Sequence, residues 1–478
     1  MKRKIVAAAL TAIGAVSAHA QELFQGPQQF LTDLQTVGVA VGDVNGDGLA
    51  DVVASGCCGF QVPPKIYVYY QQADRTLNPH PFVYLPQFAG GSISIGDVTG
   101  DGRNDIVTQA FNAIVVIPQG SGGTLEPSIS YPSVYNEQAK LGDLNGDGRL
   151  DVIGLEFSVD GHINTEEAGI FYQNPAGSFD PQVLVPLPHG FNDDVQVADI
   201  NGDGRVDVIA VNAFNEPPIT ILYQSADGTL SAPVQLAIAP GVTAGHVGVA
   251  DLNGDGRKDL AVTFGAFDEP NAHLAVFLQS ADGSFAAPSI QDVATRLTAL
   301  EVADANGDGR QDILLLHTLS IGILLQNADG SLAPETLLQI PQNAGGHYQG
   351  GFVAQDINGD GAVDLAYTQV GAQGAVTMYF GIPRVVNHPP VARNDRATLK
   401  CDASIVIPVL ANDRDPDGDP LSVVAVSKPA HGTARVTEDG RRVKYDPQRR
   451  FRGTDRFTYT VSDGRGGTAT ATVTVVVK

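Results

Sequence analysis

The sequence has little of what nucleic-acid-binding and membrane-spanning proteins need. Tryptophan is absent, aromatic residues make up 7 %, and no segment after the N-terminus is a long apolar run; a membrane-spanning helix needs about 20 such residues. Lysine and arginine number 29 against 53 aspartates and glutamates, and the formal net charge is -24. Nucleic-acid binding depends on basic surface that displaces counterions. The composition therefore argues against nucleic acid as a partner and directs attention to bound cations.

Cysteine is also scarce. Cys57 and Cys58 are adjacent and Cys401 stands alone, which is neither a disulfide framework nor a zinc-ligand spacing. Two interpretations of the adjacent pair stay open: a strained disulfide between neighbours, or two small buried residues in a loop at the end of a strand.

The first 20 residues have the pattern of a secretory signal peptide. A basic start at Lys2, Arg3 and Lys4 precedes a short apolar run, and Ala18 and Ala20 provide the small residues of a cleavage site. The apolar run is too short to span a bilayer. We therefore expect residues 1–20 to be removed, and the mature chain to be secreted, periplasmic or at the cell surface with no transmembrane segment.

An internal repeat organises most of the remaining chain. The pattern Asp-x-Asn-Gly-Asp-Gly-x-x-Asp recurs at intervals of roughly 50 residues, a spacing typical of repeat architectures. Thr99 is the one departure from asparagine at the third position. The seven copies span residues 43–51, 97–105, 143–151, 199–207, 251–259, 304–312 and 356–364.

Each copy lies between alternating apolar runs that are typical of strands. Asp-Gly turns such as the one at 281–284 indicate hairpins further along the unit. The unit therefore predicts four antiparallel strands, the size of a propeller blade. The last unit lacks its fourth strand, and residues 23–27 keep the spacing of that strand. We predict an all-β fold, a seven-bladed β-propeller over residues 21–384 closed by the N-terminal strand; an open solenoid is the alternative.

The repeated loop carries the donors of a cation site. Positions one, three, five and nine offer carboxylate or amide oxygens, position seven offers its backbone carbonyl, and the glycines permit the tight turn. Oxygen donors without histidine or cysteine favour Ca²⁺ over Mg²⁺ in a flexible site; hydrogen-bond capping without metal is the alternative. The expected metal ligands are Asp43, Asn45, Asp47, Leu49 and Asp51; Asp97, Thr99, Asp101, Arg103 and Asp105; Asp143, Asn145, Asp147, Arg149 and Asp151; Asp199, Asn201, Asp203, Arg205 and Asp207; Asp251, Asn253, Asp255, Arg257 and Asp259; Asp304, Asn306, Asp308, Arg310 and Asp312; Asp356, Asn358, Asp360, Ala362 and Asp364.

With these seven loops and their strand-like flanks, residues 22–384 resemble the FG-GAP/VCBS repeat family, which includes the integrin α-subunit propeller. The resemblance implies a seven-bladed propeller with about seven Ca²⁺ ions, one in the loop that joins two strands of each blade. The family is functionally mixed and includes adhesion proteins, carbohydrate-binding proteins and a few polysaccharide lyases. The resemblance therefore points to the architecture more firmly than to the activity.

We interpret residues 385–390 as a linker and 391–478 as a small β-sandwich of short strands. The acidic run 412–419 and the pattern of 451–464 resemble the bacterial cadherin-like, Ig-like repeats of large surface proteins. That resemblance implies a spacer or adhesive module, with a further candidate Ca²⁺ site at Asp413, Asp415, Asp417 and Asp419. The basic residues of 441–456 fit either docking to an anionic partner or solvated charges on strand edges.

No motif of a known catalytic class is present, so we expect no catalytic residues. His246, His347, and His189 beside Asp193 and Asp194 lie where they could approach an axial channel, but we favour ordinary loop positions for each of them. We therefore favour a secreted, monomeric, Ca²⁺-stabilised protein that binds an extracellular glycan or protein ligand. A lyase-like enzyme acting on a polysaccharide and a structural spacer in a surface layer or matrix are the alternatives.

Overall fold

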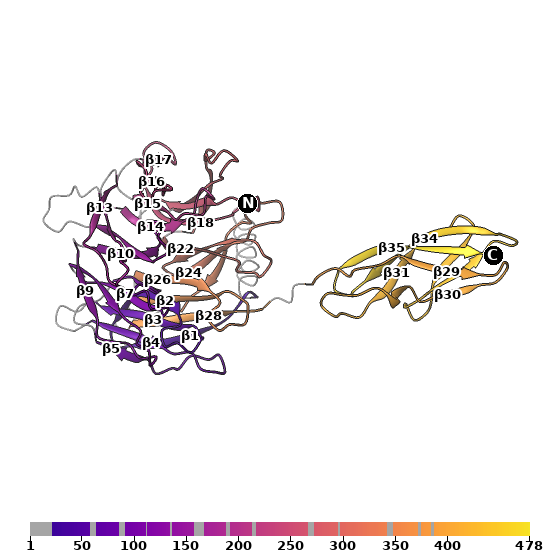
Figure 1. Ribbon diagram of the computed structural model, residues 1–478, viewed down its shortest axis with the longest axis horizontal. Coiled ribbons are helices and arrows are strands. Elements are labelled where there is room, and N and C mark those ends of the chain that lie inside the picture. The colour runs from indigo at the N-terminus through magenta and orange to yellow at the C-terminus, as the bar shows by residue number, and fades with distance from the viewer. Residues whose placement is uncertain are drawn as a thin grey trace, which may run out of the picture. The chain divides into compact units, whose positions relative to one another are not determined.

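The computed structural model shows two compact units, Met1–Arg384 and Val385–Lys478. Both are built from strands (Figure 1), and the only helical element in the described residues is a 3-10 turn, Val409–Ala411. The prediction of an all-β chain is confirmed, and none of the described helical residues could cross a membrane. The structure describes residues 22–57, 64–85, 91–110, 112–133, 136–156, 167–187, 192–212, 217–265, 272–294, 297–341, 348–370, 374–383 and 387–478.

In the described part of the first unit, seven antiparallel sheets have four strands each. Six of them use four strands that follow one another in the chain. These are β2 (Gln35–Gly42), β3 (Asp51–Cys57), β4 (Lys65–Tyr69) and β5 (Phe82–Tyr84); β6 (Ile93–Gly96), β7 (Asp105–Ala110), β8 (Ala113–Ile117) and β9 (Ile129–Pro132); β10 (Asn136–Gly142), β11 (Asp151–Glu156), β12 (Glu167–Phe171) and β13 (Val183–Pro186); β14 (Asn192–Ala198), β15 (Asp207–Asn212), β16 (Ile219–Leu222) and β17 (Val234–Leu236); β18 (Ala244–Ala250), β19 (Asp259–Phe264), β20 (Ala272–Phe277) and β21 (Ser289–Val293); β22 (Leu297–Ala303), β23 (Asp312–His317), β24 (Ser320–Leu324) and β25 (Thr336–Gln339).

The remaining sheet of this unit takes one strand from the other end of the chain. Its order is β1-β28-β27-β26, and β1 runs antiparallel to β28, with Phe24 opposite Gly381 and Thr32 opposite Gly374. The first described strand, β1, thereby pairs with the last strand of the unit, β28. The four strands are β1 (Phe24–Thr32), β26 (Tyr348–Gln355), β27 (Asp364–Val370) and β28 (Gly374–Gly381).

The sheets pack face against face, and their apolar side chains form the core. The first strands of consecutive sheets lie side by side from β2 to β26, and β26 in turn lies beside β2. In Figure 1 β2, β22 and β26 lie toward the middle of the unit, while β5, β9 and β13 lie at its edge. The cluster between the first and last sheets includes Val52, Tyr67, Val376 and Met378, all buried. Because both faces of each sheet are covered, strands such as Asp312–His317 are buried along their whole length.

The second unit is a sandwich of two small sheets. One has the order β29-β35-β34-β31 and the other β30-β33-β32. Tyr445 from one sheet and Tyr459 and Val473 from the other are fully buried in a shared core. The strands are β29 (Asp395–Leu399), β30 (Ile405–Ile407), β31 (Ser422–Val426), β32 (Gly432–Val436), β33 (Val443–Pro447), β34 (Gly453–Ser462) and β35 (Thr468–Val477).

Candidate metal sites

Each acidic loop joins the first and second strands of its sheet, and the turn has the same backbone in all seven copies. In the fourth loop, Asp199 Oδ2 accepts a hydrogen bond from the Gly204 amide at 2.8 Å, and Asp203 Oδ1 accepts one from the Arg205 amide at 3.0 Å. The equivalent bonds recur in the other six loops. Gly202 and Gly204 have φ of 74° and 83°, values that favour glycine.

The aspartate at position nine points into the sheet instead of toward solvent. Asp207 is fully buried; its Oδ2 accepts from the Ile200 amide at 3.1 Å and its Oδ1 from the Gln224 amide at 2.8 Å. All seven copies have both bonds, with Gly381 in place of the glutamine in the last sheet. This carboxylate therefore ties the loop to the end of the third strand, a role that the sequence analysis missed.

Burial raises the pKa of the position-nine carboxyl groups. The pKa reaches about 6 for Asp51 and about 7 for Asp312, because desolvation outweighs the backbone hydrogen bonds that favour the ionised form. The charges at positions one and five raise it further; in the first loop these are Asp43 and Asp47. The carboxylates of a loop therefore repel one another across the turn, a repulsion that a cation would relieve.

The donor chemistry of the loops fits a hard cation. Side-chain donors at positions one, three, five and nine are all oxygens, as Ca²⁺ prefers. In the sixth loop Asn306 Oδ1, at position three, is buried without a hydrogen-bond partner, so an acceptor is free at a predicted ligand position. The three carboxylates of a loop do not all lie within 4.8 Å of one another, because position nine is held by backbone amides. In the second loop, the amide of Thr99 bonds Asp105 at 3.0 Å.

The side chain at position seven divides the loops into two classes. In five of them it is an arginine whose guanidinium pairs with the aspartate at position five: Arg103 with Asp101, Arg149 with Asp147, Arg205 with Asp203, Arg257 with Asp255 and Arg310 with Asp308. Nε of each arginine also donates to the carbonyl of the glutamine that follows the third strand, at 2.8 to 3.0 Å. Sequence analysis considered only the backbone carbonyl of these residues.

The first and seventh loops have apolar side chains at position seven, Leu49 and Ala362. The side-chain partner of the aspartate at position five is then a neutral amide: Asn45 Nδ2 donates to Asp47 at 3.1 Å, and Asn358 Nδ2 donates to Asp360 at 3.1 Å. The fourth loop has this bond as well, from Asn201 to Asp203 at 3.0 Å, in addition to its arginine. These two loops therefore hold the same number of carboxylates as the others with no guanidinium of their own.

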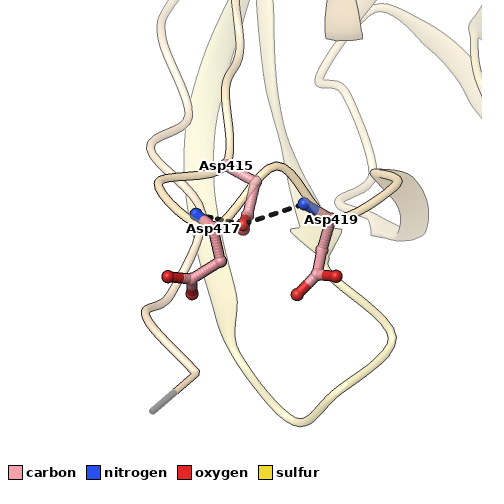
Figure 2. Close-up of side chains that lie close together, drawn as sticks. All are labelled: Asp415, Asp417 and Asp419. Carbon is pink, nitrogen blue, oxygen red and sulfur yellow. Dashed lines mark hydrogen bonds between the residues drawn. The ribbon is translucent and has the colours of Figure 1, made fainter. Parts of the chain in front are cut away.

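The second unit brings three carboxylates closer together than any described loop of the first. Asp415, Asp417 and Asp419 present ligand oxygens within 4.8 Å of one another (Figure 2). Asp415 Oδ1 accepts from the amides of Asp417 and Asp419 at 2.9 and 3.2 Å. Oδ2 of Asp415 and Oδ2 of Asp419 are buried without a partner, so this group has oxygens that the protein leaves unsatisfied.

Four further residues of the second unit form a chain of contacts that starts at this group. His388 donates its amide to Asp417, and the neighbouring Asn387 donates Nδ2 to Asp463 Oδ2 at 2.7 Å. Oδ1 of Asn387 is buried without a partner. Arg465 Nε pairs with Asp419 at 3.1 Å, and its amide bonds Asp463.

Asp413, the fourth residue of the predicted cluster, lies in a different set of contacts. Its carboxylate accepts from the Arg393 amide at 2.7 Å and from the Tyr459 hydroxyl at 2.8 Å. Burial, with the charge of Asp413 adding to it, raises the pKa of nearby Asp395 to about 6. The structure thus brings together three of the four predicted aspartates.

Of the histidines singled out in the sequence, His246 lies on β18, one of the first strands. Burial lowers its pKa, while the charge of Asp194 acts in the opposite direction. Glu301, on the neighbouring β22, has its pKa raised to about 7, chiefly by burial, with Lys140 lowering it. His189, His347 and Cys58 and the side chains of Cys57 and Asp193 lie outside the described residues; Cys401 is a free thiol.

Comparison with known proteins agrees with this division of the chain. The model of the FG-GAP-like repeat matches residues 97–154, 143–210, 199–262 and 304–367, and that of the bacterial Ig domain matches 387–476. Integrin alpha pat-2 of Caenorhabditis elegans is 24% identical over 266 residues, 52% of this chain and 19% of that protein. Protein GAMETE EXPRESSED 2 of Arabidopsis thaliana is 38% identical over 88 residues, 18% of this chain and 9% of that protein. The chain thus matches a fifth or less of the length of these relatives.

Solved structures with a similar course of the chain have low sequence identity. A lectin of Agrocybe aegerita that recognises non-reducing terminal N-acetylglucosamine gives a TM-score of 0.46 at 19% identity, covering 64% of this chain and 80% of the lectin. The Dos1 propeller gives 0.44 at 11% identity, covering 75% of this chain and 95% of that one.

The repeated strand–loop–strand unit and the sandwich that follows it define a modular all-β protein. The first unit carries FG-GAP-like repeats, and the second is a bacterial Ig domain.

Proposed function

We propose that this protein is a secreted, Ca²⁺-stabilised binding module, in which a closed seven-bladed propeller presents a binding surface to an extracellular glycan or protein. The observation that carries the proposal is the sevenfold recurrence of one all-oxygen loop with the same hydrogen bonds in every copy. The similarity of half the chain to an integrin alpha chain supports a role in binding.

Ring closure is supported by the pairing of β1 with β28 and by the position of β26 beside β2. Closure removes sheet edges that would otherwise pair with other chains. It also gives a rigid frame, on which loops of different length can carry specificity.

The ligand-binding surface lies on the side of the propeller away from the acidic loops. Consecutive connections between antiparallel strands alternate between the two ends of a sheet. The acidic loops leave from one end, so the connections between second and third strands leave from the other. Those connections differ in length, as at 58–64, 157–166 and 213–218. Ca²⁺ then stabilises the frame, and the variable connections contact the ligand.

In the loops, the residues at positions one, three, five, seven and nine would hold the ion, which supplies the positive charge that the turn lacks. The backbone amides keep the carboxylates at positions one and five in place. The second unit would hold one more ion at Asp415, Asp417 and Asp419, where unpartnered oxygens converge.

Two measurements test the proposal on the mature chain. Metal analysis after equilibration in millimolar Ca²⁺ is expected to find about seven ions in the propeller and one in the second unit; a metal-free protein would contradict the calcium sites.

A glycan and protein-ligand array, probed in Ca²⁺, is expected to show selective binding. A matched array with Asp417→Asn, a change confined to the second unit, should show the same ligands. Retention of nothing on either array would contradict the binding role while leaving the calcium sites intact.

A further inference from the structure

The calcium loops are not equivalent, and the difference lies in the residue at position seven. In five loops a guanidinium already pairs with the carboxylate at position five; in the fourth loop this is Arg205 with Asp203. The carboxylates of Asp47 and Asp360 in the first and seventh loops accept from neutral amides, those of an asparagine side chain and of the backbone. Hydrogen bonds between two charged groups are stronger than neutral ones, so the two classes differ in how well the empty loop neutralises its own charge.

The two loops without arginine occupy a special place in the fold. They belong to the sheets β2-β3-β4-β5 and β1-β28-β27-β26, which pack on each other through Val52, Tyr67 and Met378. We call this contact the first–last interface. It joins the two sheets that are farthest apart in the chain, and one of those sheets depends on β1 for its fourth strand.

The seventh loop also contacts β1 through a short chain of bonds. Asp364, at position nine, accepts from the Gly381 amide at 2.7 Å, and Gly381 lies opposite Phe24 of β1. A change at this loop therefore reaches the strand that completes the last sheet.

The first sheet contributes an arginine side chain to the seventh loop across the first–last interface. Five hairpin turns have glycine between their third and fourth strands, at Gly123, Gly177, Gly228, Gly283 and Gly330. The turn of the first sheet has Arg75 at that place, with φ of 67°, and its guanidinium donates to the Gly359 carbonyl of the seventh loop. The first loop receives no equivalent contact from the described residues around it.

We infer that position seven determines how strongly each loop depends on Ca²⁺, and that this dependence is concentrated in the first and seventh loops, at the first–last interface. The inference rests on the proposed calcium sites and names the loops that respond to the metal. In the arginine loops Ca²⁺ has to compete with the guanidinium for the carboxylate at position five, and on release the guanidinium restores the pair. Filled and empty states therefore differ less there than in the first and seventh loops, where removal of the ion leaves the carboxylates facing only amides.

Hydrogen exchange of the full mature chain, compared in Ca²⁺ and in EGTA, tests this loop by loop. For each peptide we compare the exchange rate in EGTA with that in Ca²⁺. This ratio is expected to be about fivefold larger for peptides over 43–51, 356–364 and β1 than for those over the five arginine loops, which corresponds to the free energy of one partly exposed ion pair. An equal response of all seven loops would overturn the inference and leave the calcium sites standing. No response in any loop would contradict the calcium sites themselves.

Reciprocal substitutions supply the control. Leu49→Arg places a guanidinium within the first loop, and we expect the response of that loop to fall to that of the others. Arg205→Leu should raise the response of the fourth loop to that of the first, while Arg75→Gly should raise that of the seventh. Each variant leaves six loops as internal references, so general instability is recognised by a rise in all of them. An unchanged pattern in Leu49→Arg and Arg205→Leu would overturn the role of position seven.

Discussion

Carboxylates are arranged differently in the two units of this chain. In the acidic loops of the first unit every aspartate accepts from backbone amides, and in the fully buried Asp207 both oxygens are engaged. In the second unit Asp415, Asp417 and Asp419 converge, and two of their oxygens are buried without a partner. In the first arrangement backbone amides hold the turn. In the second, three negative charges lie beside the guanidinium of Arg465, and a bound cation would offset the excess.

Removal of Ca²⁺ has the largest expected effect, and it compares the units directly. Extracellular sites bind with Kd of roughly 10⁻⁴–10⁻³ M, so each contributes about 0.4–1.4 kcal/mol at about 1 mM Ca²⁺ and seven contribute about 3–10 kcal/mol. We expect excess EDTA to lower the melting temperature of the first unit much more than that of the second. Calorimetry of the mature chain, with and without EDTA, measures both; an unchanged first transition would contradict the prediction.

Substitution at position nine tests the amide-bonded arrangement without metal. In EGTA, Asp207→Ala leaves two buried amides unpaired and is expected to cost about 2–5 kcal/mol. Asp207→Asn keeps an acceptor for one amide and should cost roughly half as much. Urea unfolding of both variants gives the comparison. Equal stability of Asp207→Ala and the unaltered protein would show that the buried carboxylate does not tie the loop to the sheet.

Glu301 extends the comparison to a carboxyl group of the first unit outside the loops. Its pKa is raised by burial from 4.5 to about 7, so the folded state binds the proton more tightly than the unfolded state. Its contribution is therefore fully present below about pH 4.5 and is lost as the pH rises through 7. We expect Glu301→Gln to reduce the fall in unfolding free energy between pH 4.5 and 8 by on the order of 1–2 kcal/mol, after allowance for solvent screening. Denaturant unfolding in EGTA from pH 4.5 to 8 measures it, and parallel curves for the two proteins would refute it.

Asp415→Asn gives the smallest expected effect and probes the second unit alone. The amide oxygen keeps both backbone bonds of Asp415 Oδ1, while one negative charge disappears. In EGTA we expect slightly slower hydrogen exchange in β34, because repulsion falls. In Ca²⁺ we expect the loss of about 0.4–1.4 kcal/mol of stabilisation by one ion. Identical Ca²⁺ dependence of β34 in both proteins would contradict an ion at this group.

Local patterns in the sequence predicted much of this structure. Alternating apolar runs and Asp-Gly turns indicated the four-stranded units, and the spacing of residues 23–27 predicted a strand in the region where β1 pairs with β28. These features were predictable because period-two burial and turn chemistry are encoded by neighbouring residues.

Side-chain partners were less predictable than strands. Nothing in the spacing of the loop indicates that position nine turns inward to amides, since that depends on the third strand. The arginine at position seven recurs in five loops and is visible in the sequence. It was considered there only for its backbone carbonyl as a metal ligand, and its side chain was not. Asp413 follows the same short-range pattern as Asp415, yet its carboxylate accepts a hydrogen bond from Tyr459. The spacing of the aspartates does not predict this contact, because Tyr459 lies on a strand that is distant in the sequence.

The pairing of β1 with β28 has a consequence for biosynthesis. Phe24–Thr32 leaves the ribosome early, whereas Gly374–Gly381 appears only after the whole repeat region has been translated. Until then the strand Phe24–Thr32 has no partner in the nascent polypeptide, and a prematurely terminated product never contains the strand that pairs with it. Such truncated products should be sensitive to proteases and prone to associate with one another, whereas full-length molecules bury both strands.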